Sequence, residues 1–117
     1  MQYLLMCCFD EAAWGKLPDV QRDRIMDEYG QLMHELKTSG RLLAGAKLDQ
    51  SASAVTVRQK NGKALITDGP FAESKEQLGG YHLIKCKDRD EAVAIALRIP
   101  TLPAGGLIEV RPLLWGE

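Results

Sequence analysis

The sequence predicts an α+β fold in which an antiparallel sheet carries two helices on one face. Two stretches have the apolar spacing of amphipathic helices, and several short apolar runs have the alternation of strands. A third observation is the Asn61-Gly62 pair, which separates two of those runs. The expected arrangement is a ferredoxin-like split β-α-β fold with an additional β-hairpin strand. With 117 residues, the chain is long enough for a single domain spanning 1–117.

The first strand and the first helix have clear local patterns. Residues 2–8 are expected to form a strand, followed by a loop that closes at Pro18. Asp19 is a good helix N-cap and Gly40 is a usual C-terminal stop, so a helix is expected over about 19–39. Its apolar positions have amphipathic spacing and comprise Ile25, Tyr29, Leu32, Met33 and Leu36.

The middle of the chain is expected to be mostly strand. Asn61-Gly62 favours a tight hairpin, because both residues tolerate the positive φ that a two-residue turn requires. A short helical turn is expected over 72–78, broken by Gly79-Gly80. Besides the first strand, the expected strands span 41–48, 54–59, 63–67, 81–86 and 107–113.

A second helix is expected after the strand at 81–86. Asp88 and Glu91 have the spacing of a capping box, in which each side chain satisfies a free backbone amide of the first turn. Pro100 cannot continue a helix and is expected to end it.

The first strand is apolar on both faces, which favours a homodimer. Two short helices can cover only one face of a sheet, so the other face is expected to pack against a second subunit. One face carries Tyr3, Leu5 and Cys7, and the other carries Leu4, Met6 and Cys8. A pocket for a small molecule is expected between the two sheets.

Composition excludes several classes of function. A net charge of -1 provides no basic surface for nucleic acid, so direct nucleic-acid binding is not expected. The apolar N-terminus is too short to span a membrane. Three cysteines without metal-ligand spacing indicate neither a disulfide framework nor a zinc site, and favour the reducing cytoplasm. No motif for a nucleotide or another cofactor occurs, and none is expected.

Asp68 is the first candidate for chemistry. Asp68-Gly69-Pro70 is typical of a turn where a strand leaves a sheet, and functional residues concentrate on such loops. Gly69 would allow close approach of a ligand to the backbone, and Phe71 would supply an apolar wall. Partial burial by Phe71 would raise the pKa of the Asp68 carboxyl toward that of a useful general base. The alternative is a structural turn in which Asp68 binds nearby amides.

His82 is the second candidate. Strand alternation places it on one face with Ile84 and Cys86, as either a core residue or an acid/base group in a pocket. Tyr81 and Tyr29 could likewise offer hydroxyl donors to a ligand or be core residues. The other histidine, His34, lies opposite the apolar positions of the first helix and is expected to face water.

Arg111 is a candidate for binding an anionic group. It shares a strand face with Glu109, two residues away, so the two side chains form either an exposed ion pair or the polar lining of a cavity. A guanidinium in a cavity would bind a carboxylate or phenolate.

The run DGPFAESKEQLGGY at 68–81 resembles the signature of the DGPF proteins, a branch of the YCII-related family of small, dimeric α/β-barrel proteins. Three more segments match: MQYLLMC at the start, GRLLAG at 40–45 and IEVRPL at 108–113. The resemblance implies a ferredoxin-like dimeric α/β barrel. A shared fold does not fix an activity.

The resemblance also exposes a departure from the family pattern. Many YCII-type relatives carry a histidine on the first helix, proposed to act with an aspartate as an acid/base pair. Counting back from Arg41, that position falls on Tyr29 here. The histidine/aspartate pair is therefore replaced by Tyr29 and Asp68, and a phenol with a pKa near 10 is a poor base at neutral pH.

Two hypotheses follow. In the first, the protein is a cofactor-free lyase or isomerase, or a ligand-binding protein, for a small cyclic or aromatic compound. Asp68 would abstract a proton, Tyr29 or His82 would donate one, and Arg111 would hold an anionic group. In the second, the protein is a non-catalytic accessory or sensor associated with an extracytoplasmic-function sigma factor, as DGPF proteins are often described.

Overall fold

The computed structural model describes residues 1–115 and confirms the ferredoxin-like α+β fold. Its main sheet has four antiparallel strands in the order β2-β5-β1-β6. They are β1 (Gln2–Phe9), β2 (Leu42–Lys47), β5 (Gln77–Lys85) and β6 (Leu107–Pro112). The first and third strands of the split arrangement therefore lie in the centre, and β2 and β6 form the edges.

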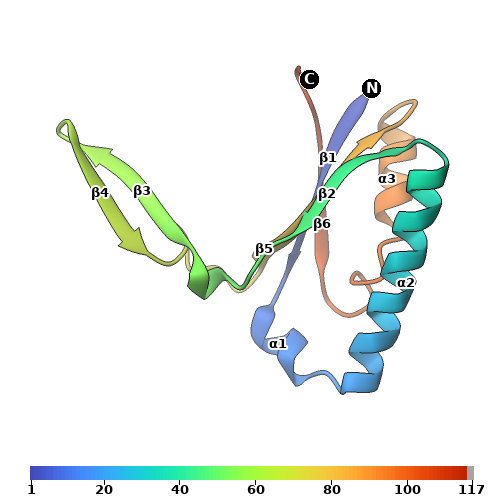
Figure 1. The fold of residues 1–117 in the computed structure, drawn as a ribbon, viewed down its shortest axis with the longest axis horizontal. Helices are drawn as coiled ribbons and strands as arrows, with labels where there is room; N and C mark the ends of the chain where they lie inside the picture. Colours follow the sequence, from blue (N-terminus) through green and yellow to red (C-terminus); the bar gives the residue numbers. More distant parts are fainter. Residues whose placement is uncertain (116–117) are drawn as a thin grey trace.

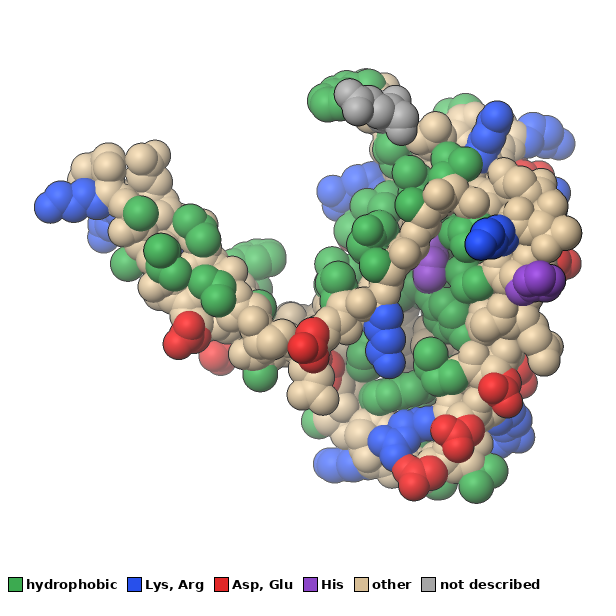
Figure 2. All heavy atoms as spheres, viewed as in Figure 1, with side chains coloured by type: hydrophobic (Ala, Val, Ile, Leu, Met, Phe, Trp, Pro, Cys, Tyr) green, Lys and Arg blue, Asp and Glu red, His purple; other side chains and the backbone are tan. Residues whose placement is uncertain are grey.

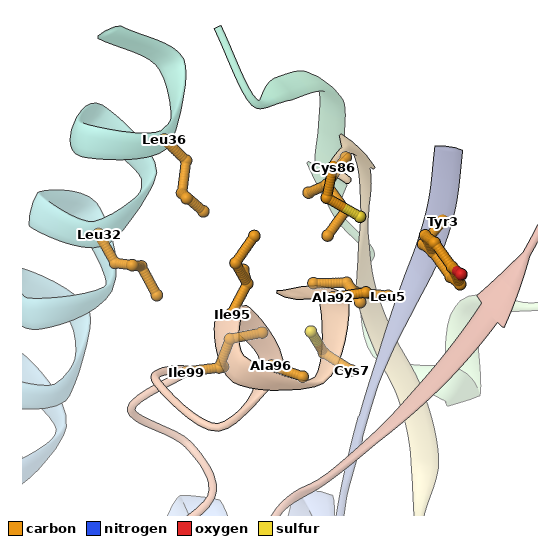
Figure 3. Close-up of a cluster of buried hydrophobic side chains, with 11 residues drawn as sticks. Tyr3, Leu5, Cys7, Leu32, Leu36, Cys86, Ala92, Ile95, Ala96 and Ile99 are labelled. Carbon is orange, nitrogen blue, oxygen red and sulfur yellow. The ribbon is translucent and has the colours of Figure 1, made fainter. Parts of the chain in front are cut away.

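Two helices cover one face of this sheet, as expected. They are α2 (Asp19–Thr38) and α3 (Arg89–Ala96), which lie on the same side of the strands (Figure 1). Figure 3 shows the core between them, where side chains of α2 and α3 point toward those of β1. The buried cluster comprises Tyr3, Leu5, Cys7, Leu32, Leu36, Ile84, Cys86, Ala92, Ile95, Ala96 and Ile99.

Of the two ends of α2, only the C-terminal one forms as the sequence predicts. The helix begins at Asp19, but Pro18 occupies the cap position and no side chain caps the helix, so the predicted N-cap role of Asp19 is wrong. At the other end Gly40 has a φ of 76°, which lets the Arg41 amide donate to the Leu36 carbonyl at 2.8 Å. This geometry is the glycine stop that the sequence predicts.

The capping box of α3 is present in part. The Glu91 amide donates to Asp88 Oδ1 at 2.9 Å, while the Glu91 carboxylate accepts from the Lys87 amide at 3.2 Å. The helix ends at Ala96, earlier than the predicted stop at Pro100. Amides 98 and 99 donate to carbonyls three residues back, so the chain tightens into turns before the proline.

The hairpin consists of β3 (Val55–Lys60) and β4 (Lys63–Asp68), as Asn61-Gly62 predicts. Asn61 and Gly62 have φ angles of 52° and 77°, the positive values of a primed two-residue turn. The hairpin is a separate two-stranded sheet that projects away from the main sheet (Figure 1). The additional hairpin that the sequence predicts is therefore present, as a sheet of its own.

The segment between β1 and α2 also differs from the expectation. Where the sequence predicts a loop, the chain forms the short helix α1 (Glu11–Lys16), because the Asp10 carboxylate accepts hydrogen bonds from the amides of residues 12 and 13. The Glu11 carboxylate accepts a 2.8 Å bond from the Ser51 amide at the start of a 3₁₀ turn, η1 (Ser51–Ser53). This bond ties α1 to the segment that leads into the hairpin.

The predicted helical turn over 72–78 is wrong. Residues from Gln77 onward belong to β5, and Gly79-Gly80 lie inside this strand instead of breaking a helix. The pairing of β1 with β5 shifts between Cys7 and Cys8, so that one extra residue of β5 forms a β-bulge around these glycines.

The two faces of β1 differ in burial. The helix face is buried as predicted, whereas on the outer face Leu4, Met6 and Cys8 are only half-buried. The outer face is therefore the one that the two helices leave uncovered, as the sequence predicts. Among residues 1–115, no helix has the length and apolar character that a membrane span requires.

Candidate active site

A cavity of about 490 Å³ lies on the helix face of the sheet. Its lining residues come from the strands β1, β2 and β5 and from the helices α1 and α2. Apolar walls are provided by Phe9, Trp14, Met26 and Met33. Figure 2 shows a histidine inside a hollow bordered by hydrophobic side chains. The cavity is lined by elements of one chain, so it is a different pocket from the one expected between the sheets of two subunits.

Two glycines let neighbouring rings lie close to the strands that line this cavity. A Cβ atom on Gly45 of β2 would lie 2.6 Å from His82 Nδ1, and one on Gly79 of β5 would lie 1.9 Å from Cε1 of Phe9. Real Cβ atoms do not approach other atoms so closely. Glycine at both positions lets the Phe9 ring and the His82 imidazole lie flat against the strands.

Three polar side chains meet in this cavity. Nε2 of His82 is in hydrogen-bond contact with the Tyr29 hydroxyl, and this hydroxyl lies 3.4 Å from the Cys7 thiol. The residues come from β5, α2 and β1 respectively. The two rings are tilted by 47° with centroids 5.4 Å apart, so they meet at their polar edges without stacking.

Burial keeps all three groups uncharged near neutral pH. It lowers the pKa of His82, because the surroundings disfavour the imidazolium ion. It strongly raises the pKa of Tyr29, and the hydrogen bond with Cys7 and repulsion from the Cys7 thiolate act in the same direction. Burial also raises the pKa of the Cys7 thiol. A neutral imidazole can accept a proton and a neutral phenol can donate one, so the site contains both functions of an acid/base catalyst.

His82 carries an unsatisfied polar atom. The residue is only 7% exposed, and Nδ1 has no hydrogen-bond partner in the part of the chain that the structure describes. The sequence left two interpretations of His82 open, a core residue or an acid/base group in a pocket. In the structure it is both buried and part of the cavity lining.

The other predicted site residues lie elsewhere in the single chain. Asp68, Gly69 and Phe71 lie at the base of the projecting hairpin and do not line the cavity. Asp68 is exposed, and Phe71 is 80% exposed, so it forms no apolar wall here. Gly69 closes the hairpin: its amide donates to the Ala54 carbonyl at 2.7 Å, and its carbonyl accepts a 2.7 Å bond from Thr56 Oγ1.

Tyr81 and Arg111 lie on the outer face of the sheet. Tyr81 pairs with Met6, and Arg111 pairs with Leu4, both of which point away from the helices. The guanidinium of Arg111 forms an exposed ion pair with Glu109, which is one of the two alternatives that the sequence left open. Neither residue lines the cavity.

Several cavity residues were missed by sequence reasoning. Cys7 was assigned only to the core, Gly45 only to a matching segment, and Gly79-Gly80 only to a break in a helix. Trp14 was placed in a loop. One sequence signal could have indicated them. The GRLLAG and LGGYH segments contain glycines within runs that otherwise predict strands, and glycine inside a strand often indicates that another group approaches the backbone closely.

The fold and the cavity define a class of protein: a small ferredoxin-like α+β protein with a largely apolar pocket between helices and sheet and an imidazole-phenol pair inside it. The model of the YCII-related domain matches residues 1–115, and the chain belongs to the YCII-related family. It is 38% identical over 117 residues to an uncharacterised protein of Rhizobium meliloti (strain 1021), with 97% of this chain and 92% of the relative covered.

The fold is also similar to a solved enzyme structure. This is the 5-chloro-2-hydroxyhydroquinone dehydrochlorinase (TftG) from Burkholderia phenoliruptrix AC1100, in complex with 2,5-dihydroxybenzoquinone. The TM-score is 0.50 at 15% sequence identity, and the match covers 99% of this chain and 96% of the enzyme. At that identity the likeness establishes the shared fold.

Proposed function

We propose that the protein binds a small cyclic or aromatic compound in the cavity and transfers a proton to or from it without a cofactor. The observation that carries this proposal is the contact between His82 and Tyr29 inside an apolar pocket. A proton acceptor and a proton donor in contact inside an apolar pocket serve either the structure or the chemistry of a protein. The neighbouring cavity favours chemistry.

The two residues would have distinct roles. His82 is neutral near pH 7, so once a ligand displaces the Tyr29 hydroxyl from it, Nε2 would accept a proton from an acidic C–H or O–H group of that ligand. Tyr29 remains protonated, and its hydroxyl would donate a hydrogen bond to a carbonyl oxygen that gains negative charge as the proton leaves. The Cys7 thiol, 3.4 Å from the Tyr29 oxygen, would hold the phenol in position.

The dimensions of the cavity suit a small ligand. Pockets for small molecules commonly have volumes of roughly 300–1,000 Å³ and mostly apolar walls, and this cavity lies within that range. Phe9 and Trp14 form a tilted aromatic pair at 6.0 Å between centroids, and both line the cavity. Their rings would pack against a flat ligand.

The comparison with TftG supports the same class of ligand. That enzyme's name describes a reaction on a substituted hydroquinone, and its structure contains a one-ring quinone. This similarity adds to the argument from the cavity and does not identify the ligand of the present chain. Neither the described residues nor the named relatives offer support for a sigma-factor partner, which stays a prediction.

We also propose that the protein is a homodimer that packs through the outer face of the sheet. This face carries half-buried Leu4, Met6 and Leu83, and burying such side chains is favourable. The projecting hairpin exposes Val57 and Ile66 by 70% and 66%. A two-stranded hairpin is marginally stable alone, so a neighbouring subunit would stabilise it.

The test of the catalytic proposal is solvent exchange. Cyclohexanone in D₂O exchanges its α-hydrogens slowly, and NMR follows the loss of their signal. The protein is expected to accelerate the exchange, and His82→Gln to remove most of the acceleration, since general acid/base catalysis contributes about 10²- to 10⁴-fold. His34→Gln is the matched control, because His34 is exposed on α2. Binding without any exchange would contradict catalysis and leave a ligand-binding protein.

A further inference from the structure

The charges around the cavity are of one sign. Two lysines line it: Lys37, in the last turn of α2, and Lys47, the last residue of β2. No aspartate or glutamate is among its lining residues within 1–115. Over the same range, neither lysine forms an ion pair with a carboxylate. Both ammonium groups are therefore available to a ligand at the rim.

The interior of the cavity cannot supply this charge. His82 is kept neutral by burial and Tyr29 stays protonated, so an anionic group placed beside them would meet no positive partner. Most of the remaining walls are apolar side chains or glycine backbone, where an unpaired charge is costly. The exposed rim, with its two lysines, can hold an anion that keeps part of its hydration shell.

We propose that the ligand is a small aromatic or cyclic monoanion, a carboxylate or a phenolate. Its ring lies inside the cavity, its charged group lies at the rim near Lys37 and Lys47, and its reactive position points toward His82. This inference rests on the proposed function and specifies the ligand class for the same cavity. Apolar walls next to exposed cations concentrate anions at such a mouth.

The two lysines are not equivalent. Lys37 lies beside the C-terminal carbonyls of α2, whose partial negative charge offsets some of its attraction for an anion. Lys47 lies at the end of an edge strand, without a helix terminus of its own. Lys47 therefore contributes more to anion binding than Lys37.

The experiment compares benzoate with benzamide, which has nearly the same shape but no charge. Trp14 lines the cavity, whereas Trp115 is 80% exposed, so a Trp115→Phe background makes the fluorescence of Trp14 the reporter of binding. Benzoate is expected to bind about 5- to 10-fold tighter than benzamide, the effect of two partly exposed ion pairs. The preference is expected to shrink at high salt, because the rim is exposed.

Variants locate the charge that matters. Lys47→Met is expected to weaken benzoate binding about 3- to 5-fold and Lys37→Met about 2-fold, each with benzamide binding unchanged. The matched control is the Lys60→Met and Lys63→Met double variant, which removes two charges from the hairpin tip. This control is expected to leave both affinities unchanged.

Each other result is decisive. Equal binding of benzoate and benzamide to the parent protein would overturn the proposed anion preference while leaving a site for neutral rings. An equal loss in the hairpin control would mean that net charge acts at long range without a rim site, which also overturns it. If neither compound quenches Trp14 at millimolar concentration, both this inference and the proposed cavity ligand fail.

Discussion

The Tyr29 hydroxyl meets Nε2 of His82 across 53 positions of sequence, joining the middle of α2 to the centre of β5. Tyr29 stands at the helix position where the resemblance to YCII-type proteins implied a histidine. In this chain the imidazole comes from the opposite wall of the cavity. The imidazole of this cavity therefore comes from the sheet, and the helix contributes a phenol.

Stability is expected to fall in mild acid because of His82. Burial lowers its folded-state pKa below the unfolded value of about 6.5, so the unfolded chain binds the proton more readily. The contribution is present above pH 6.5 and is lost as the pH falls from there toward the folded-state pKa, by at most about 1.4 kcal/mol per pH unit. Urea unfolding between pH 7.5 and pH 5 measures it. His82→Gln should flatten this slope and His34→Gln should not; identical slopes in all three proteins would contradict the assignment.

Tyr29→Phe is expected to lower the free energy of unfolding by about 1–2 kcal/mol, because it removes a buried hydrogen-bond partner from His82. The same variant should only slightly steepen the dependence of the free energy of unfolding on pH, since burial is the cause of the lowered pKa of His82. Chemical denaturation at pH 7.5 checks the first effect. A variant as stable as the parent would show that this contact is not formed in solution.

Gly79→Ala is expected to cost about 1–3 kcal/mol, because its Cβ would overlap the Phe9 ring and force the ring from its place. Phe9→Ala in the same chain should recover part of that loss, and the double-mutant cycle measures the coupling. Gly30→Ala is the matched control: nothing lies within 4 Å of its Cβ. This helix substitution should stabilise the protein by about 0.5–1 kcal/mol.

Leu83→Glu is expected to convert a dimer into a monomer, because a carboxylate on the outer sheet face cannot be buried without a partner. Sedimentation at micromolar concentration distinguishes the two states. Val20→Glu, at a position on α2 that is 78% exposed, should remain dimeric. A parent protein that sediments as a monomer would refute the homodimer.

Asp68 is expected to contribute to the cavity of a second subunit, because its hairpin projects away from the main sheet of its own chain. Asp68→Asn and His82→Gln proteins would each be inactive in the exchange assay. Unfolding and refolding them together should restore partial activity, since one site of each mixed dimer regains both residues. No recovery despite mixed dimers would remove Asp68 from the site.

Local sequence patterns predicted the fold well where one residue type decides the backbone. Asn61-Gly62 determined the hairpin turn and Gly40 the end of α2, because few other residues adopt a positive φ. Such patterns failed at Gly79-Gly80, since glycine indicates a helix break and a β-bulge equally well. The short helix α1 depends on one capping carboxylate, that of Asp10, and has no amphipathic pattern to reveal it.

The candidate site was predicted in part. Strand alternation placed His82 on the correct face, and the spacing of α2 placed Tyr29 on the inner side. Their contact depends on how α2 crosses the sheet, which no local pattern specifies. Asp68 drew attention because its turn chemistry is unusual, yet that chemistry is accounted for by Gly69 closing the hairpin. The cavity escaped prediction because its lining comes from several elements far apart in the sequence, whose packing no local pattern specifies.

The two glycines make the pocket sensitive to change in different ways. A Cβ atom on Gly45 would lie 2.6 Å from Nδ1 of the His82 imidazole, whereas one on Gly79 would lie 1.9 Å from the Phe9 ring. A side chain at Gly79 would therefore reshape the aromatic wall alone. A side chain at Gly45 would also move the imidazole, so the shape of the pocket and its chemistry would change together.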